Sequence, residues 1–318
     1  MLARTADNIY WVSRYLERAD FLARLIEASN RIAAVPTSAT RQDEWTSVLI
    51  ASGADETFPE HFDVANQGNV TAYLAFDARN PSSIRNCIEF ARTNARAVRT
   101  ALTTEMWEHI NSAWLKLNDF ESKHRDAAAA DHEALIGFLE FVKETSSLYD
   151  GYGYRTMLRN DVYYFSRLGA ALERADNTAR VLDVKYQLLL PENEAVGGTV
   201  DYFQWSAILR AVSAVTAYHW VYRESIQPWN VADLLILRPE MPRSLIACYD
   251  NVVRWLDAIG NQYGRQGDAQ RQARAIKRKL ESASIRDIFQ SGLHQFVDEF
   301  INENNSLANA ISEQYLLG

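Results

Sequence analysis

The pattern Leu-Glu-Arg-Ala-Asp-x-x-Ala-Arg occurs twice in this chain of 318 residues, at positions 16–24 and 172–180. A pattern that returns after 156 positions indicates an internal repeat, and a repeat constrains the fold because both copies must pack in similar surroundings. We predict a single domain over residues 1–318 that is built by internal duplication. Its halves are expected at about 1–155 and 156–318, related by a pseudo-twofold axis.

Further landmarks recur in the same order. Trp45 corresponds to Trp205 at a shift of 160 positions, and Cys87 corresponds to Cys248 at a shift of 161. Because the two cysteines occupy equivalent positions, we expect reduced thiols and no disulfide between them. Residues 1–14 lack the apolar run of a signal peptide, so the predicted location is cytoplasmic.

The composition indicates a folded protein that can bury a large core, since 47% of the residues are apolar. A net charge of −8 argues against a protein that coats nucleic acid or an anionic membrane. No apolar run approaches the roughly 18 residues that a membrane span requires. We therefore expect neither nucleic acid nor membrane among the partners.

Helical periodicity runs through most of the sequence, whereas the alternating β-branched runs of strands are almost absent. The predicted fold class is all-α, a bundle of long helices. Continuous helices are expected over 202–222 and 284–315, among others. The Asp-Gly-Tyr-Gly run at 150–153 is expected to form a hinge near the boundary between the halves.

Each copy of the pattern places three charged residues on one polar arc of its helix, because positions i, i+3 and i+7 share a face. These residues are Glu17, Asp20 and Arg24 in the first copy, and Glu173, Asp176 and Arg180 in the second. The motif arginines Arg18 and Arg174 point away from this arc, toward mostly apolar neighbours. A guanidinium in such surroundings needs a carboxylate or a bound anion.

Three interpretations of the motif arginines remain open. In the first, Arg18 pairs with Glu173 and Arg174 pairs with Glu17 across the pseudo-twofold axis, and the role is structural. In the second, both Glu-Arg pairs line a central polar cavity that binds substrate. In the third, the arginines are simply exposed to solvent.

Weaker candidates for anion binding lie elsewhere in the chain. Arg92 and Arg96 share a helical face that could clamp a carboxylate or phosphate, although the spacing alone favours a solvated face. Ser83 and Ser244 could expose helix amides to an anion or could cap the helices that follow them. Arg243 adds positive charge beside the second of these sites.

Metal and nucleotide signatures are mostly missing. Glu105 and His109 are i, i+4 neighbours, but the sequence nominates no third ligand. Phosphate-binding glycine loops and nucleophile elbows do not occur in the sequence. We expect no metal site and no directly bound cofactor.

Several runs together resemble the bacterial alpha-E domain family over essentially the whole chain. These are the paired Glu-Arg helices, Ala-Arg-x-Asn-Ala-Arg at 91–96, Glu105-x-Trp107, Leu168-Gly169 and Pro242-Arg243-Ser244. Ser13 departs from the pattern, which has glycine there, and this suggests slightly looser packing. The resemblance implies a circularly permuted ATP-grasp ligase as partner, with a transglutaminase-like protease commonly nearby. ATP and Mg would then be held by the ligase.

The leading hypothesis is a helical partner of an ATP-grasp ligase in ATP-dependent amide or peptide-bond formation, or in modification of a peptide or small-molecule substrate. If the chain is itself catalytic, a buried glutamate with a raised pKa could act as general base. Its central site would comprise Glu17, Arg18, Glu173 and Arg174. The substrate contacts would come from Arg92, Arg96, Ser83, Arg243, Ser244, Asp20, Asp176, Arg24 and Arg180.

Two other hypotheses compete with this one. The first is a non-catalytic structural or scaffolding subunit whose Glu-Arg pairs stabilise the bundle. The second is a metal-dependent helical enzyme that uses carboxylates and a histidine.

Overall fold

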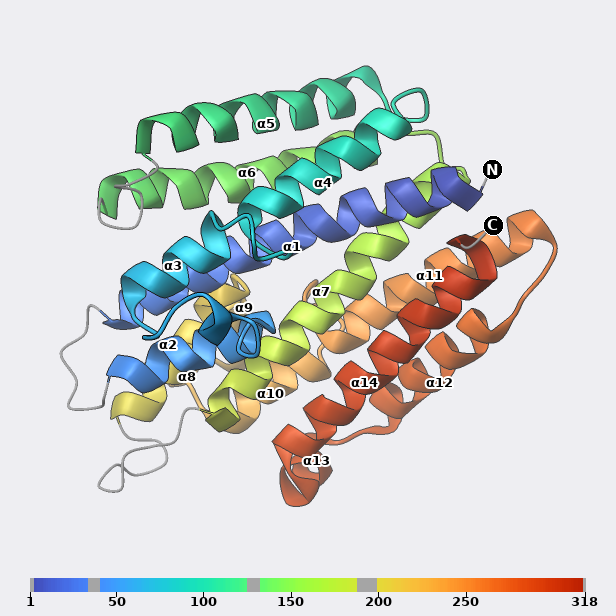
Figure 1. The fold of residues 1–318 in the computed structure, drawn as a ribbon. Coiled ribbons are helices and arrows are strands. Elements are labelled where there is room, and N and C mark those ends of the chain that lie inside the picture. The colour runs from blue at the N-terminus through green and yellow to red at the C-terminus, as the bar shows by residue number, and fades with distance from the viewer. Residues whose placement is uncertain (1–2, 34–40, 125–131, 188–198, 317–318) are drawn as a thin grey trace.

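The computed structural model describes residues 3–33, 41–124, 132–187 and 199–316, and within these ranges the regular elements are all helical. The predicted all-α fold is therefore confirmed (Figure 1). None of the helices in these ranges combines the length and apolarity that crossing a membrane requires.

The first half of the chain contains six α-helices among the described residues. They are α1 (Ala3–Ala33), α2 (Arg41–Ser52), α3 (Gln67–Ala75), α4 (Ile84–Ala97), α5 (Thr104–His124) and α6 (His132–Thr156). A 3-10 turn at Phe58–Glu60 separates α2 from α3.

The second half continues with eight α-helices in the described ranges. They are α7 (Asp161–Gln187), α8 (Thr199–Ala211), α9 (Val215–Tyr222), α10 (Pro228–Ile236), α11 (Leu245–Tyr263), α12 (Asp268–Ser282), α13 (Ile285–Ser291) and α14 (Leu293–Ile311). A π-helical turn, Ser312–Leu316, follows α14.

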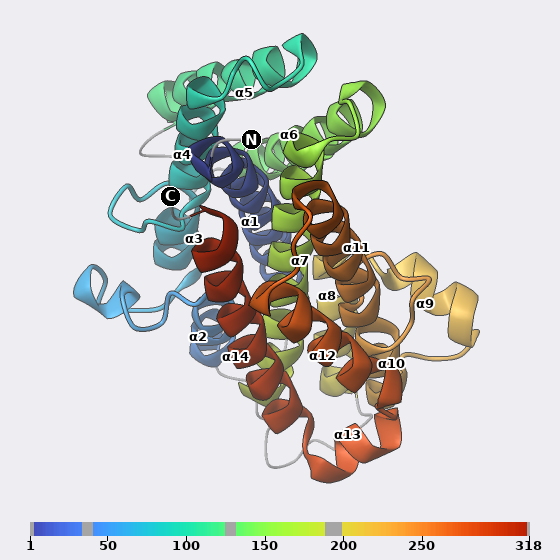
Figure 2. The ribbon, with the colours of Figure 1, turned by 90° about the vertical axis from the view of Figure 1, so that its right-hand side faces the viewer.

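The long motif helices α1 and α7 pack against each other in the middle of the bundle (Figures 1 and 2). Around α1 lie α4, α6 and α8, and around α7 lie α11, α14 and α2. Each central helix is thus flanked by the helix that Ser83 or Ser244 caps, by a long helix from its own half, and by a short helix from the other half. This packing is consistent with the predicted pseudo-twofold relation between the two halves. The duplication itself stays a prediction.

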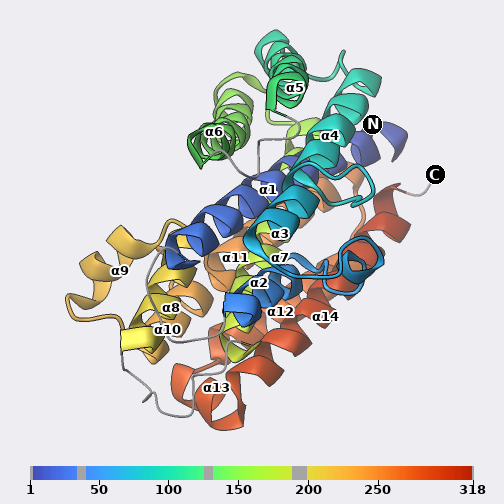
Figure 3. The same ribbon diagram turned by 60° about the vertical axis from the view of Figure 1, so that its left-hand side comes forward.

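Two helices that were expected to be continuous are interrupted. The helix over 202–222 ends at Ala211 and restarts at Val215, because Ser213 adopts a left-handed backbone conformation with φ of 55°. The helix over 284–315 is broken at Gly292, where φ is 107°. The first break places α9 beside the C-terminal end of α1 (Figure 3).

The expected hinge at 150–153 is wrong, because α6 runs through this segment to Thr156. Gly153 packs beside the side chain of Met106, and a Cβ atom added to Gly153 would lie 3.4 Å from the Met106 Cε. Two glycines weaken an isolated helix by about 1 kcal/mol each, and tertiary packing of this kind outweighs that local cost.

The backbones of α1 and α7 approach closely where Gly169 faces Tyr10. A Cβ atom on Gly169 would lie 2.4 Å from the backbone oxygen of Tyr10, so no larger residue fits without moving a helix. On the other side of the crossing, the hydroxyls of Ser13 and Ser166 are hydrogen-bonded at 2.8 Å. The looser packing expected from Ser13 is not found, because that residue is buried and bonded.

Replacing Gly169 with alanine should lower the free energy of unfolding by about 1–3 kcal/mol or more, because the clash is with backbone and no rotamer change relieves it. Gly137 provides a matched control, since it also lies in a helix and a Cβ atom added there would have no neighbouring atom within 4 Å. Gly137→Ala is expected to be neutral or stabilising. Urea unfolding followed by circular dichroism compares the two, and equal effects would contradict the close crossing.

Candidate functional site

The motif glutamates and arginines pair across the two central helices. Arg18 donates from Nε to Glu173 Oε1 at 2.6 Å. Arg174 donates from Nε and Nη2 to the two carboxylate oxygens of Glu17, at 3.0 and 2.7 Å. The reciprocal pairing predicted from the duplicated motif is confirmed, and the interpretation of the arginines as simply exposed is wrong.

A second arginine binds each glutamate, and the two halves of the chain supply this arginine from different positions. Arg243 donates to Glu17 Oε1 at 2.8 Å, and its backbone oxygen accepts a hydrogen bond from Thr178 of α7. Arg14 donates to Glu173 Oε2 at 2.7 Å. The sequence counterpart of Arg243 is a serine, so the second cation of Glu173 comes from α1 itself.

Arg14 is the residue of this network that the sequence reasoning missed. It lies one helical turn before Arg18 and thus on the same side of α1, which is the signal that was available. Its guanidinium also lies 4.7 Å from the centre of the Trp11 ring, a cation–π contact that covers it from solvent. Ser82, the counterpart of Arg243, accepts a hydrogen bond from Arg18 at 3.3 Å.

Both glutamates are ionised in this environment. Burial opposes the charge of Glu17, but the charges and hydrogen bonds of Arg174 and Arg243 outweigh burial and lower its pKa to about 2. Burial likewise opposes ionisation of Glu173, and its two arginines lower that pKa to about 2. The prediction that one of these glutamates is a general base with a raised pKa is therefore wrong. A carboxylate that binds its proton so weakly is a poor base near neutral pH.

The motif aspartates extend the network along each helix. Arg24 donates to Asp20 at 2.8 Å and Arg180 donates to Asp176 at 2.6 Å, as the i, i+4 spacing predicts. Arg243 also reaches Asp20, at 2.8 Å. One oxygen of each aspartate, Oδ1, is buried without a hydrogen-bond partner. Because both copies share this feature, it belongs to the motif and not to one site.

The serine candidates serve as helix caps. The Ser83 hydroxyl accepts from the backbone amide of Asn86, and the Ser244 hydroxyl accepts from the backbone amide of Ala247. Both serines are fully buried, so of the two interpretations the structure supports capping.

Arg92 and Arg96 lie apart from the motif network. Arg92 donates to Asn111 of α5 at 3.0 Å and lies over the Trp114 ring, and Arg96 is exposed. The face of α4 that carries them packs on α5 or faces solvent, apart from the central glutamates, and their role in anion binding stays a prediction.

The weak metal pair is not assembled either. His109 bonds through Nε2 to the backbone oxygen of Thr145 at 2.8 Å. Across the described ranges, no group of three or more His, Cys, Asp or Glu side chains is arranged to hold a metal ion. Both cysteines are free and buried, and burial raises the pKa of each thiol to about 12.

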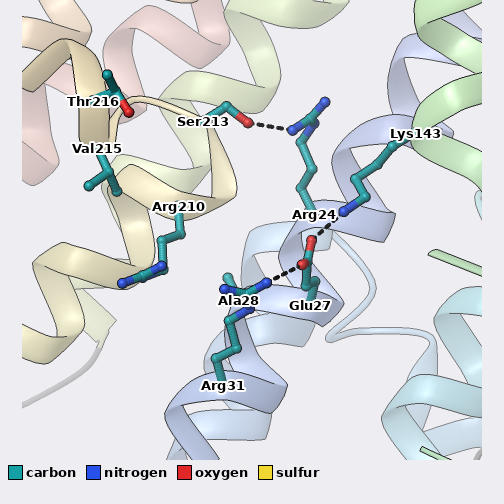
Figure 4. Close-up of a pocket in the computed structure, with 9 residues that line it drawn as sticks. All are labelled: Arg24, Glu27, Ala28, Arg31, Lys143, Arg210, Ser213, Val215 and Thr216. Carbon is teal, nitrogen blue, oxygen red and sulfur yellow. Dashed lines mark hydrogen bonds and ion pairs between the residues drawn. The ribbon is translucent and has the colours of Figure 1, made fainter. Parts of the chain in front are cut away.

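A pocket of about 330 Å³ lies at one edge of the network, between α1, α6 and the α8–α9 segment (Figure 4). We call it the basic pocket. It is lined by Arg24, Glu27, Ala28, Arg31, Lys143, Arg210, Ser213, Val215 and Thr216. Arg24 connects it to the network, since this side chain bonds to Asp20 and also to the Ser213 hydroxyl.

Sequence reasoning found only Arg24 among these lining residues. Glu27 and Arg31 follow it at helical spacing and could have been found in that way. Lys143 and Arg210 reach the pocket from other helices, and no local pattern brings them together with α1.

Comparison with known proteins identifies one matching family. Its sequence model matches residues 1–316 and is described as a predicted alpha-helical domain with a conserved ER motif. The Glu-Arg pairs at 17–18 and 173–174 fit that description. Comparison with curated proteins and with solved structures gives no match.

Replacing Arg174 with methionine is expected to lower the free energy of unfolding by about 3 kcal/mol, because Glu17 stays buried with one of its two arginines missing. Arg271→Met is a suitable control, since that side chain is 75% exposed and pairs with an exposed aspartate. Chemical unfolding at pH 7 should show no effect of the control. A loss as small for Arg174→Met would show that the network adds little to stability.

Stability should fall in acid because of the same two glutamates. Their pKa is lowered from 4.5 to about 2 in the folded protein, so their contribution is present above about pH 4.5 and is lost as the pH falls toward 2. Urea unfolding between pH 7 and 2.5 measures this slope. The Glu17→Gln/Glu173→Gln variant should be less stable at pH 7 and should lose less stability on acidification; an unchanged slope would contradict the assignment.

Proposed function

The chain belongs to the Alpha-E family, and from that premise we propose that it is a non-catalytic helical partner of an ATP-grasp ligase. The ligase would hold ATP and Mg and form an amide or peptide bond on a peptide or small-molecule substrate. A transglutaminase-like protease is a second proposed partner. The proposed setting is the cytoplasm, where ATP is available and the thiols of Cys87 and Cys248 stay reduced.

The observation that supports a non-catalytic role is that arginines pair with both oxygens of each motif glutamate. Both oxygens of Glu17 and both oxygens of Glu173 accept hydrogen bonds from arginines. Such carboxylates bind a proton too weakly to act as bases near neutral pH, and arginines already balance their negative charge. The motif therefore serves to hold α1 and α7 together.

The same arrangement bears on how a partner would be bound. Rigid central helices keep the outer helices in fixed relative positions, and a fixed surface binds a partner with little loss of conformational entropy. The buried network thus supports binding indirectly, through the positions of the helices around it.

The experiment is to co-express the chain with a circularly permuted ATP-grasp ligase from the same organism and to measure complex formation and product formation. Product is followed by mass spectrometry and by ADP release. We expect a stable complex, and we expect the folded Glu17→Gln/Glu173→Gln variant to support the same rate as the wild type below its unfolding temperature.

Two outcomes would overturn the proposal separately. Failure of the two proteins to associate would remove the partnership. Loss of product with the variant, while its circular dichroism spectrum and its binding to the ligase stay unchanged, would show that the glutamates take part in the chemistry.

A further inference from the structure

We propose that the basic pocket binds the phosphate group of a small molecule. This inference goes beyond the proposed function, because it concerns the isolated chain and requires no ligase. It is carried by the charge of the pocket, by the neutral donors around it, and by a comparison with the equivalent place in the other half of the chain.

The lining of the pocket has more cations than anions although the whole chain carries a net charge of −8, and one of these cations, Arg24, is already paired with Asp20. Four cations line it, Arg24, Arg31, Lys143 and Arg210, against the single carboxylate of Glu27. Glu27 accepts from Arg31 at 2.7 Å and from Lys143 at 2.6 Å, so it positions two cations and neutralises one charge (Figure 4).

Arg210 supplies a cation that the protein itself does not use. Its side chain is exposed and has no ion-pair or hydrogen-bond partner among the residues that the structure describes. An arginine that lines a concave site without a carboxylate partner is available to an anion, and its planar guanidinium can bind two oxygens of a phosphate at once.

Neutral donors complete the lining. The hydroxyls of Ser213 and Thr216 face the pocket, and Val215 and Thr216 form the first turn of α9. Ala214, at the N-cap of this helix, provides no side-chain hydrogen bond to the first turn. The amides at the start of α9 are therefore without a side-chain cap, and such amides favour an anion.

The other half of the chain contains an equivalent place that lacks these groups. Gly53 follows Trp45 by as many positions in the sequence as Ser213 follows Trp205. Gly53 and Ser213 both adopt a left-handed backbone conformation, with φ of 67° and 55°. The next amide bonds back in the same way in each half, from Ala54 to Leu49 and from Ala214 to Leu209.

The residues at these matched positions differ in chemistry. Ile50 stands where the pocket has Arg210, and Gly53 stands where it has Ser213. Glycine adopts the left-handed conformation without strain, whereas serine does so at a cost. The turn therefore needs neither the serine nor the arginine for folding. What the two residues add is a hydroxyl and a cation, both of them in the pocket.

Phosphate fits this set of donors better than a carboxylate does. A phosphate group near neutral pH carries about −1.5 to −2 charges and three strong acceptor oxygens, which matches a pocket lined by several cations and two hydroxyls. The volume of about 330 Å³ admits a phosphate together with a small organic group. Free phosphate and a phosphorylated metabolite share this chemistry.

The test is isothermal titration of the full chain at low salt with inorganic phosphate, pyrophosphate, ADP and succinate. We expect saturable binding of at least one phosphate compound and at least a tenfold weaker affinity for succinate. Arg210→Gln should weaken phosphate binding about tenfold and Ser213→Gly about threefold, in each case without loss of helical content. Arg271→Gln, far from the charged lining in sequence and exposed, is the matched control and should bind as the wild type does.

Each result decides the proposal. Tight binding of ADP or pyrophosphate with weak binding of inorganic phosphate supports an organic phosphate or diphosphate as ligand, and equal affinities support free phosphate. Absence of saturable binding by all the phosphate compounds overturns the proposal. So does an unchanged affinity in both Arg210→Gln and Ser213→Gly, or binding of succinate as tight as that of the phosphates.

Discussion

The fold depends on two glutamates that are buried between α1 and α7 and that each hold two arginines. Glu17 and Glu173 carry their charges out of water, and this desolvation is costly unless the geometry of the ion pairs is good. Every carboxylate oxygen of the pair is bonded at 3.0 Å or less. The network therefore specifies how the two long helices face each other, since a shift along either helix would leave charges buried without partners.

The packing at the crossing makes this specification possible. Gly169 allows the backbone of α7 to approach that of α1 at Tyr10, and the small pair Ser13 and Ser166 fills the other side. Close approach at these positions brings the motif residues of both helices, one turn further on, within hydrogen-bonding distance. Electrostatic pairing and steric fit thus support the same arrangement, which is typical of a sequence that folds to one structure.

The differences between the halves carry more information about function than their similarities do. Arg243 has a serine as its counterpart, and Arg210 has an isoleucine. The first difference is compensated structurally, because Arg14 supplies the missing cation to Glu173. The second has no compensation in the other half, and it leaves an exposed cation in a pocket. The equivalent turn in the other half forms with Ile50 at this position, so folding does not require Arg210. We therefore assign Arg210 to binding.

Local sequence determined what depends on one or two helical turns: the all-α class, the i, i+4 pairs such as Asp20 with Arg24, and, through the repeat, the pairing of Arg18 with Glu173. It failed where long-range packing outweighs local preference, as at 150–153, where contacts of Gly153 keep α6 continuous. Only the tertiary structure decided that Arg14 and Arg243 are the second partners of the glutamates, that the pKa of these carboxyl groups is low, and that Arg210 lines a pocket together with residues of α1. Each of these facts depends on side chains that are distant in sequence, and the packing of the other helices around α1 and α7 brings them together.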